Sequence, residues 1–173
     1  MTVIEAVENT AIDFNGLVRE HQAMVYSVAW HFLRDRPLAE EVAQDVFFSL
    51  HRNLGNIESP RHAIAWLRKV AVQRAIDAGR RRKRLPRIGL EEVPEPASFD
   101  PRYDPWLGES LRRMVGSLPE AQRMVVILRY QEELEPAEIA GLLEMPLATV
   151  KSHLHRALAL LREKLERRGM GER

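Results

Sequence analysis

The sequence contains no cysteine, and this absence excludes several kinds of site at once. Without thiols the chain can form no disulfide, no thiolate zinc site and no cysteine nucleophile. Long apolar runs are missing too: the longest have five residues, as in Met124–Leu128, whereas a membrane-spanning helix needs about twenty. No apolar segment follows a basic N-terminus, since the first basic residue is Arg19. The sequence therefore predicts a cytoplasmic protein without membrane insertion.

The chain also lacks a strong overall charge, because 26 Lys and Arg residues are balanced by 25 Asp and Glu residues. The charges are nevertheless segregated along the sequence. Residues 61–87 carry a net charge of +9 and residues 146–173 one of +4, whereas residues 1–60 and 88–110 each carry −5. Such segregation indicates partners with charged surfaces, nucleic acid among them.

Five of the ten prolines lie between Pro86 and Pro105, in an acidic stretch without helical or strand periodicity. This composition predicts a flexible linker over residues 86–105. It divides the chain into a first module, residues 10–85, and a second module, residues 106–168. An extended linker of this length spans at most about 65 Å, so the modules are expected to reach sites far apart.

Apolar residues recur at steps of three and four in both modules, which predicts an all-α protein of two small helical domains. In the first module, Asp13 is a predicted N-cap, a second helix follows Pro37, and Ser59 caps a third that ends before Pro86. In the second module, Pro119 opens one helix.

The end of the second module has the pattern of a helix-turn-helix. A short helix from Pro136 to about Glu144 is followed by a break at Met145 and Pro146 and by a longer helix over residues 148–168. The helical period places one set of residues inward: Val150, Leu154, Ala157, Leu158, Leu161 and Leu165. It places another outward, where a recognition helix meets base edges: Lys151, Ser152, His155 and Arg156. Thr149 is predicted to cap this helix and to offer a backbone N–H to a phosphate. The alternative is a plain helical hairpin with a solvated basic face.

The segment LPEAQRMVVILRYQEELEPAEIAGLLEMPLATVKSHLHRALALLREKL, residues 118–165, resembles the C-terminal domain of bacterial sigma factors, which binds the upstream ("minus thirty-five") promoter element. AEEVAQDVFFSLHRNL, residues 39–54, with AWLRKVAVQRAIDAGRRRKR, residues 65–84, is similar to the second conserved sigma region. That region binds core polymerase and opens the downstream ("minus ten") element. The whole chain resembles an extracytoplasmic-function (ECF) sigma factor.

The resemblance implies core RNA polymerase and promoter DNA as partners and, as is common in this family, an anti-sigma factor. It departs from the usual pattern at His51, Gln73 and Ala148, where the family has Trp, Asn and Gly. The residues expected at the upstream element are Thr149, Lys151, Ser152, His153, His155 and Arg156.

Two parts of the first module are expected at the downstream element. One is a loop that resembles the segment in which the family binds a flipped base, and the other is the basic third helix. Their residues are Asn56, Ile57, Glu58, Ser59, Arg61, His62, Gln73, Asp77, Arg80, Arg81 and Arg84. Arg68 and Arg74 are further candidates for phosphate contacts. The resemblance implies that one face of the second helix docks on an arginine-rich coiled coil of the polymerase: Glu41, Gln44, Asp45 and Phe48. The alternative is that Phe48 packs in the core and the acids only solubilise.

The sequence predicts neither an enzyme nor a cofactor. The histidines do not pair as metal ligands, and no phosphate-binding glycine loop or nucleophile elbow is present. Two rivals to the sigma factor are a dimeric helix-turn-helix regulator, which needs a symmetric dimer surface that no heptad supplies, and an RNA-processing enzyme, which needs acid, metal or nucleophile clusters.

Overall fold

The computed structural model describes residues 13–84 and 105–171, and these ranges fall into two groups of α-helices. Within them no strand occurs, in agreement with the all-α prediction. The predicted proline-rich linker lies almost entirely outside the described residues. Among the residues described, no helix is long and apolar enough to cross a membrane.

The first module is a bundle of three helices, α1 (Phe14–Leu33), α2 (Arg36–Asn53) and α3 (Pro60–Arg84), with a short 3-10 turn, η1 (Leu54–Asn56), after α2. Asp13 caps α1 as predicted, accepting from the backbone N–H groups of Asn15 and Gly16 at 3.0 and 2.9 Å. Asp35 caps α2 in the same way, so this helix begins at Arg36, one residue before Pro37.

The second module contains α4 (Pro105–Gly116), α5 (Glu120–Val126), α6 (Pro136–Leu143) and α7 (Leu147–Gly171). Between α5 and α6 the chain forms a π-helical segment, η2 (Ile127–Gln131). The π-turn widens the helix by one residue, and Glu133, two residues after η2 ends, adopts a left-handed backbone with φ of 55°.

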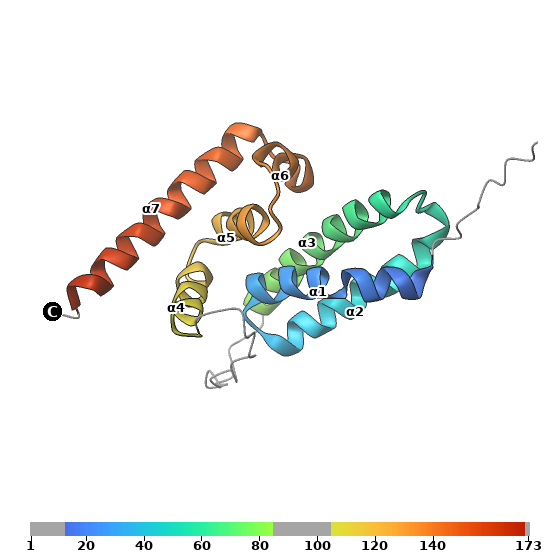
Figure 1. Ribbon diagram of the computed structural model, residues 1–173, viewed down its shortest axis with the longest axis horizontal. Helices are drawn as coiled ribbons and strands as arrows, with labels where there is room; N and C mark the ends of the chain where they lie inside the picture. The colour runs from blue at the N-terminus through green and yellow to red at the C-terminus, as the bar shows by residue number, and fades with distance from the viewer. Residues whose placement is uncertain (1–12, 85–104, 172–173) are drawn as a thin grey trace, which may run out of the picture.

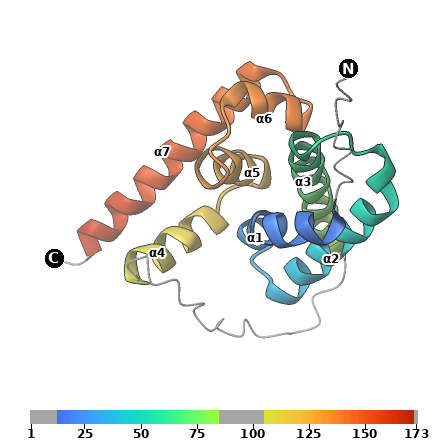
Figure 2. The same ribbon diagram turned by 45° about the vertical axis from the view of Figure 1, so that its right-hand side comes forward.

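The two modules pack against each other through one hydrophobic core, which the sequence did not predict. α1 packs against α5 and η2, and α3 packs against α6. The cluster of buried residues includes Val28 and Phe32 of α1 together with Val125, Leu128 and Ile139 of the second module. Figures 1 and 2 show α5 lying between the first module and α7.

Two details of α7 differ from the predictions. The helix begins at Leu147, and the backbone N–H of Thr149 donates to the carbonyl of Pro146 at 2.9 Å. Thr149 therefore lies in the first turn, and the prediction that it caps the helix and offers this N–H to a phosphate is wrong. Leu158 and Leu165, predicted to face inward, are 42% and 49% exposed.

Candidate promoter and polymerase interface

The turn between α6 and α7 is fixed by local backbone geometry. Glu138 in the first turn of α6 accepts from the backbone N–H of Glu135 at 2.8 Å. At the other end Glu144 adopts a left-handed conformation, with φ of 53°, and the N–H of Met145 donates to the carbonyl of Ala140 at 3.1 Å. The geometry ends α6 sharply and lets α7 begin after three intervening residues, as a helix-turn-helix requires.

The outer face of α7 carries the charged residues that the sequence placed there. Lys151, His155 and Arg156 are exposed, whereas Val150 and Ala157 are fully buried. Ser152 and His153 are half-buried, and Nδ1 of His153 is buried without a hydrogen-bond partner among the described residues. Three side chains are therefore free to reach into a DNA groove near the N-terminus of α7, and His153 lies beside them.

The loop before α3 folds back on the helix that follows it. Ser59 Oγ accepts from the backbone N–H of His62 at 3.1 Å, which makes Ser59 the cap that the sequence predicted. Nδ1 of His62 accepts from the backbone N–H of Glu58 at 3.2 Å. Ile57, expected at the downstream element, is buried in the core, so its side chain anchors the loop from inside. The other residues expected there are at least partly exposed: Asn56, Glu58, Ser59, Arg61 and His62.

The far half of α3 exposes one row of polar and basic side chains. All of the residues expected on this helix are exposed, namely Gln73, Asp77, Arg80, Arg81 and Arg84. Arg68 differs, because its side chain is 25% exposed and its Nε lies 3.6 Å from Oε2 of Glu132 in the second module. In this conformation the guanidinium of Arg68 is thus paired with the carboxylate of Glu132, and the Arg68 side chain does not belong to the exposed row.

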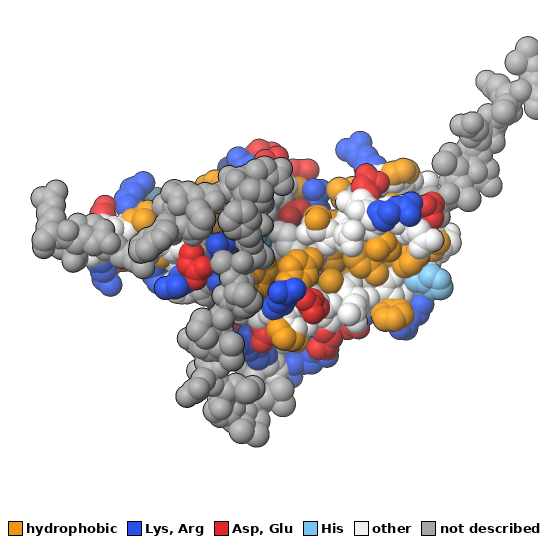
Figure 3. Space-filling model, turned by 60° about the horizontal axis from the view of Figure 1, so that its bottom comes forward, with side chains coloured by type: hydrophobic (Ala, Val, Ile, Leu, Met, Phe, Trp, Pro, Cys, Tyr) orange, Lys and Arg blue, Asp and Glu red, His pale blue; other side chains and the backbone are white. Residues whose placement is uncertain are grey.

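One face of α2 carries an exposed aromatic side chain that follows two acidic residues. Phe48 is 64% exposed, whereas Val42, Val46 and Leu50 on the opposite face of the helix are at most 1% exposed. The alternative in which Phe48 packs in the core is therefore wrong. Glu41 and Gln44 are exposed and Asp45 is half-buried. Figure 3 shows apolar side chains gathered on one face of the first module with acidic and basic ones around them.

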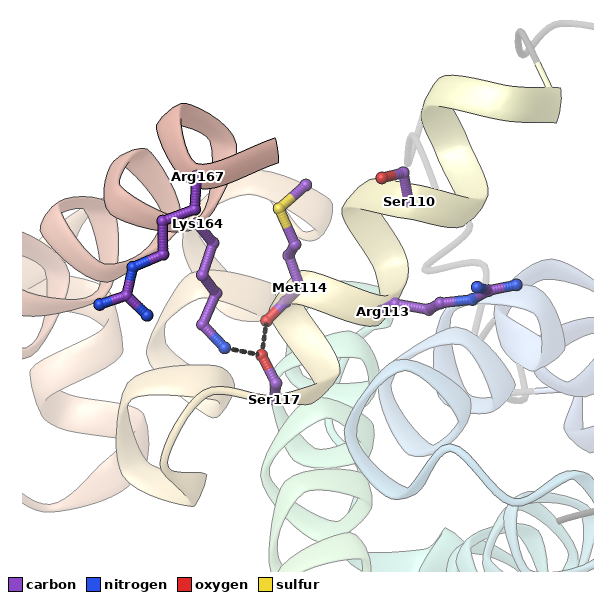
Figure 4. A pocket seen from close by; sticks show the side chains of 6 residues that line it. All are labelled: Ser110, Arg113, Met114, Ser117, Lys164 and Arg167. Carbon is purple, nitrogen blue, oxygen red and sulfur yellow. Dashed lines mark hydrogen bonds between the residues drawn. The ribbon is translucent and has the colours of Figure 1, made fainter. Parts of the chain in front are cut away.

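A hollow of about 270 Å³ lies between α4 and α7 and is a candidate for a small-molecule site. Figure 4 shows Lys164 of α7 directed at the hydroxyl of Ser117, which in turn donates to the carbonyl of Met114 at 2.7 Å. Arg113 points away from Lys164 and pairs with Glu109. Lys164, Ser117 and Arg113 are thus engaged with the protein itself, and the contact of Lys164 with Ser117 joins α7 to the end of α4.

Three ionisable groups near the contact between the modules have shifted pKa values: His31, Arg123 and Glu132. Burial lowers the pKa of Arg123. Burial, assisted by the positive charges of Arg34 and Arg112, lowers the pKa of His31 to about 4, so that this imidazole is neutral near pH 7. Burial raises the pKa of Glu132, and the guanidinium of Arg68 partly opposes that shift. Across the described ranges no group of three His, Asp or Glu side chains could hold a metal ion.

Several residues at the contact between the modules were not found by sequence reasoning. Arg123, Glu120, Glu132 and Glu144 each contact the first module through a hydrogen bond or an ion pair. Each partner lies at least 37 residues away in the sequence, and neither spacing nor composition signals such pairing.

Comparison with known proteins identifies both modules. The profile of Sigma-70 region 2 matches residues 17–85, and that of Sigma-70, region 4 matches residues 108–161. The RNA polymerase sigma-E factor of Streptomyces avermitilis is 33% identical over 163 residues, which cover 94% of this chain and 90% of that protein. The ECF RNA polymerase sigma factor SigW of Bacillus subtilis is 26% identical, with 88% of each chain covered.

Solved structures share the fold. The sigma factor RpoE from Bartonella quintana, in complex with the anti-sigma factor NepR, has a TM-score of 0.73 at 20% identity, over 89% of this chain and 97% of that one. CnrH, in complex with the cytosolic domain of CnrY, has a TM-score of 0.64 at 20% identity, over 88% and 87%. With both conserved sigma regions present in order, the chain belongs to the extracytoplasmic-function family of RNA polymerase sigma factors, which bind core polymerase and direct transcription initiation at specific promoters.

Proposed function

We propose that this sigma factor binds its partners through three surfaces. One face of α2 docks on core polymerase. The loop before α3, together with the exposed row of α3, holds the melted downstream element, and the outer face of α7 recognises the upstream element. The observation that carries the proposal is the exposure of Phe48, since a large aromatic side chain left in water on an otherwise well-packed helix is typical of a protein interface.

The docking surface combines an apolar anchor with acids. Phe48 supplies the apolar contact, while Asp45 and Glu41, one and two turns earlier, complement a basic partner. Aromatic anchors in the centre of an interface contribute most of its binding free energy, and charges at the rim set orientation and association rate. The expected partner surface on the polymerase is therefore basic with an apolar pocket.

The two DNA-binding surfaces are proposed to recognise different forms of promoter DNA. On α7, Arg156 and Lys151 suit guanine edges and phosphates in the major groove of closed DNA. On α3, Gln73 and Asp77 are polar groups one turn apart, and Arg80, Arg81 and Arg84 attract the backbone of a separated strand. The loop residues Asn56, Glu58, Ser59, Arg61 and His62 are proposed to hold a base that has left the stack.

The overall role is tested by adding the purified chain to core polymerase and a random promoter library and sequencing the run-off transcripts. A sigma factor yields transcripts from a shared two-element promoter, whereas a stand-alone regulator yields none above the level of core polymerase alone. The second outcome would overturn the proposal.

The docking surface is tested with Asp45→Arg, which places a cation against the expected basic partner. Affinity for core polymerase should fall about tenfold or more, with helix content unchanged. Glu20→Arg is the matched control, because it makes the same change of charge at an exposed position of α1. Equal affinities of the two variants for core polymerase would show that this face of α2 does not dock.

Two further proposals concern regulation and location. The similar sigma factor RpoE has been solved in complex with the anti-sigma factor NepR, and the similar protein CnrH in complex with the cytosolic domain of CnrY. We propose a protein inhibitor of the NepR kind for the present chain. Because core polymerase acts in the cytoplasm, we place the protein there as well. Co-purification of a tagged chain from unstressed cells tests whether such an inhibitor is bound.

A further inference from the structure

Two hydrogen bonds cross each other in the loop before α3, and both involve His62. The backbone N–H of His62 donates to Oγ of Ser59 at 3.1 Å, and the backbone N–H of Glu58 donates to Nδ1 of His62 at 3.2 Å. Ile57 is 6% exposed, and its N–H donates to the carbonyl of Leu54 at 3.1 Å. The loop is therefore fixed to the core by Ile57 and to the start of α3 by His62.

This arrangement is a variant of the capping box. In the usual form the third helical residue is Glu or Gln, and its side chain accepts from the backbone N–H of the N-cap. Here the third helical residue is His62, and its ring accepts from Glu58, the residue before the cap. A carboxylate in this role has acceptors only, whereas an imidazole has a second nitrogen that is able to bind something else.

The bond to Glu58 also determines which nitrogen of His62 carries the proton. A backbone N–H only donates, so Nδ1 must present its lone pair, and the neutral ring then carries its proton on Nε2. Within residues 13–84 and 105–171 the side chain of His62 makes this one hydrogen bond, which leaves Nε2–H without a protein acceptor. Nε2 lies on the edge of the ring that points away from the capped N–H, and the half-buried side chain is open to a ligand.

His62 lies in line with the exposed row of α3. Gln73 follows it by about three helical turns and Arg80 by five, so the three side chains share one face of the helix. Along the axis Gln73 is about 16 Å from His62, and Arg80 is about 27 Å from it. A strand held along the exposed row and in the loop therefore passes His62, where the two parts of the surface meet.

We propose that the two ring nitrogens of His62 have separate roles: Nδ1 positions the loop, and Nε2–H is a fixed hydrogen-bond donor to the melted strand. This inference rests on the proposed function, because the strand is the one assigned there to the loop and α3. The partner of Nε2–H is an acceptor atom, which is a base carbonyl, a base ring nitrogen or a phosphate oxygen. An amino group of a base cannot take its place, because it donates as well.

The tautomer is measured by nitrogen NMR of the imidazole rings in the full chain at pH 8, where exposed histidines are neutral. The sequence has six histidines, and the signals of His62 are those missing from the spectrum of His62→Asn. We expect a protonated Nε2 and an unprotonated Nδ1. A proton on Nδ1, or an equal mixture of the two tautomers, would overturn the proposal.

Three variants separate the two nitrogens. In His62→Asn the side-chain oxygen takes the place of Nδ1, so the acceptor for Glu58 is kept and the donor at Nε2 is lost. In His62→Gln the amide nitrogen reaches the place of Nε2, so the donor is kept and the acceptor is lost. His62→Ala lacks both. His51→Asn is the matched control, because His51 is an exposed histidine of α2 outside the loop and the exposed row.

The role of Nδ1 is tested by the exchange of the Glu58 amide proton with water in the free protein. Exchange should be about three- to tenfold faster in His62→Ala and His62→Gln than in the wild type, which corresponds to the loss of one hydrogen bond. It should return to the rate of the wild type in His62→Asn and should not change in His51→Asn. Equal rates in the wild type and His62→Ala would show that Nδ1 does not hold the loop.

The role of Nε2–H is tested with the holoenzyme and a single strand that carries the downstream element. Binding by His62→Asn should be about three- to tenfold weaker than by the wild type, although the loop is intact, and His51→Asn should bind as the wild type does. Strands with one abasic site or one methylphosphonate then locate the acceptor. Loss of the difference between wild type and His62→Asn at an abasic site assigns a base, and its loss at a methylphosphonate assigns a phosphate.

Equal binding of the strand by the wild type and His62→Asn would overturn the role of Nε2–H, and so would a difference that no modified strand removes. Failure of the wild-type holoenzyme to bind the strand at all would instead count against the proposed function of this surface. The tautomer and the exchange of the Glu58 amide are measured without DNA, so the two proposals can fail independently.

Discussion

Arg123 of α5 donates a hydrogen bond of 2.7 Å from Nη1 to the backbone carbonyl of Phe32, the second-last residue of α1. Its Nη2 donates to the carbonyl of Leu118 at 3.0 Å, and the guanidinium lies 5.6 Å from the centre of the Phe32 ring. One side chain thus joins the C-terminal end of α1 to the loop that begins α5. A cation at this end of a helix also interacts favourably with the helix dipole.

Replacement of Arg123 by Ala is expected to destabilise the contact between the modules. Two carbonyl groups lose a charged donor, which costs about 1.5 to 3 kcal/mol in the free energy of unfolding. Urea denaturation followed by circular dichroism measures the change. Arg162→Ala, at an exposed position of α7, is the control and should cost less than about 0.5 kcal/mol. Equal stability of the two variants would contradict the assigned role of Arg123.

His31 predicts a loss of stability in mild acid. Its pKa is lowered from 6.5 to about 4 by burial and by Arg34 and Arg112, so the unfolded chain binds more protons than the folded one between these pH values. The contribution of His31 is complete above pH 6.5 and is lost as the pH falls to 4, by up to about 3 kcal/mol. Stability should therefore decrease as acid is added.

The variant His31→Gln isolates this effect. Its free energy of unfolding, measured in urea between pH 4 and 7, should fall less steeply with decreasing pH than that of the wild type. The raised pKa of Glu132 acts in the opposite direction, but it is common to both proteins. Parallel pH profiles of the two would show that His31 titrates normally.

Local signals in the sequence predicted the local structure well. Asp13 and Ser59 were identified as caps because a short polar side chain before an apolar periodic segment has few other roles, and both accept the predicted backbone hydrogen bonds. The helix-turn-helix followed in the same way from Pro136, Pro146 and the period between them. Periodicity alone left open whether Phe48 packs in the core or lies exposed on the docking face, and its exposure in the structure excludes the core position.

The features that the sequence did not predict depend on contacts between residues far apart in the chain. Leu158 and Leu165 continue the apolar period of α7, but α4, α5 and α6 cover only the stripe of Val150, Ala157 and Leu161, so the two leucines remain exposed. The packing of the modules could not be predicted either. It depends on tertiary contacts, such as that of Arg123 with Phe32, and no periodic pattern in the sequence indicates such contacts.

Replacement of Phe48 by Ala should separate binding from stability. Because the side chain is 64% exposed, its loss should change the free energy of unfolding by less than about 0.5 kcal/mol. Loss of an aromatic anchor at the centre of an interface should weaken binding to core polymerase by about 2 kcal/mol, or about thirtyfold. Titration of labelled core polymerase measures the affinity, and Leu111→Ala, another exposed apolar side chain, serves as a control outside the docking face. Unchanged affinity of Phe48→Ala would place docking elsewhere.

Simultaneous replacement of Arg80 and Arg81 by Ala should impair promoter opening and spare the closed complex. Both side chains are exposed on α3, in the row proposed to hold the separated strand. Permanganate footprinting of one promoter reports melting, and a gel shift of the same complex reports closed binding. If the double variant melts the promoter as efficiently as the wild type, the outer row of α3 does not hold the open strand.

Replacement of Arg156 by Ala should relax the choice of upstream sequence. Arg156 is exposed on the outer face of α7, and arginine is the side chain best suited to a bidentate contact with guanine in the major groove. Its loss should cost about 1 to 3 kcal/mol on the preferred promoter and weaken discrimination at one or two base pairs. Selection from a library randomised in the upstream element measures both effects.

Lys151→Ala can be compared with Arg156→Ala in the same experiment, because Lys151 is an exposed residue on the same face of α7, near the start of the helix. If Lys151 contacts a phosphate, Lys151→Ala should weaken all upstream sequences alike and reduce the salt dependence of binding by about one charge. A base contact would instead change the selected sequence. Arg156→Ala that retains the sequence preference of the wild type would show that another surface reads the upstream element, because a residue that contacts a base edge cannot be removed without changing the preference there.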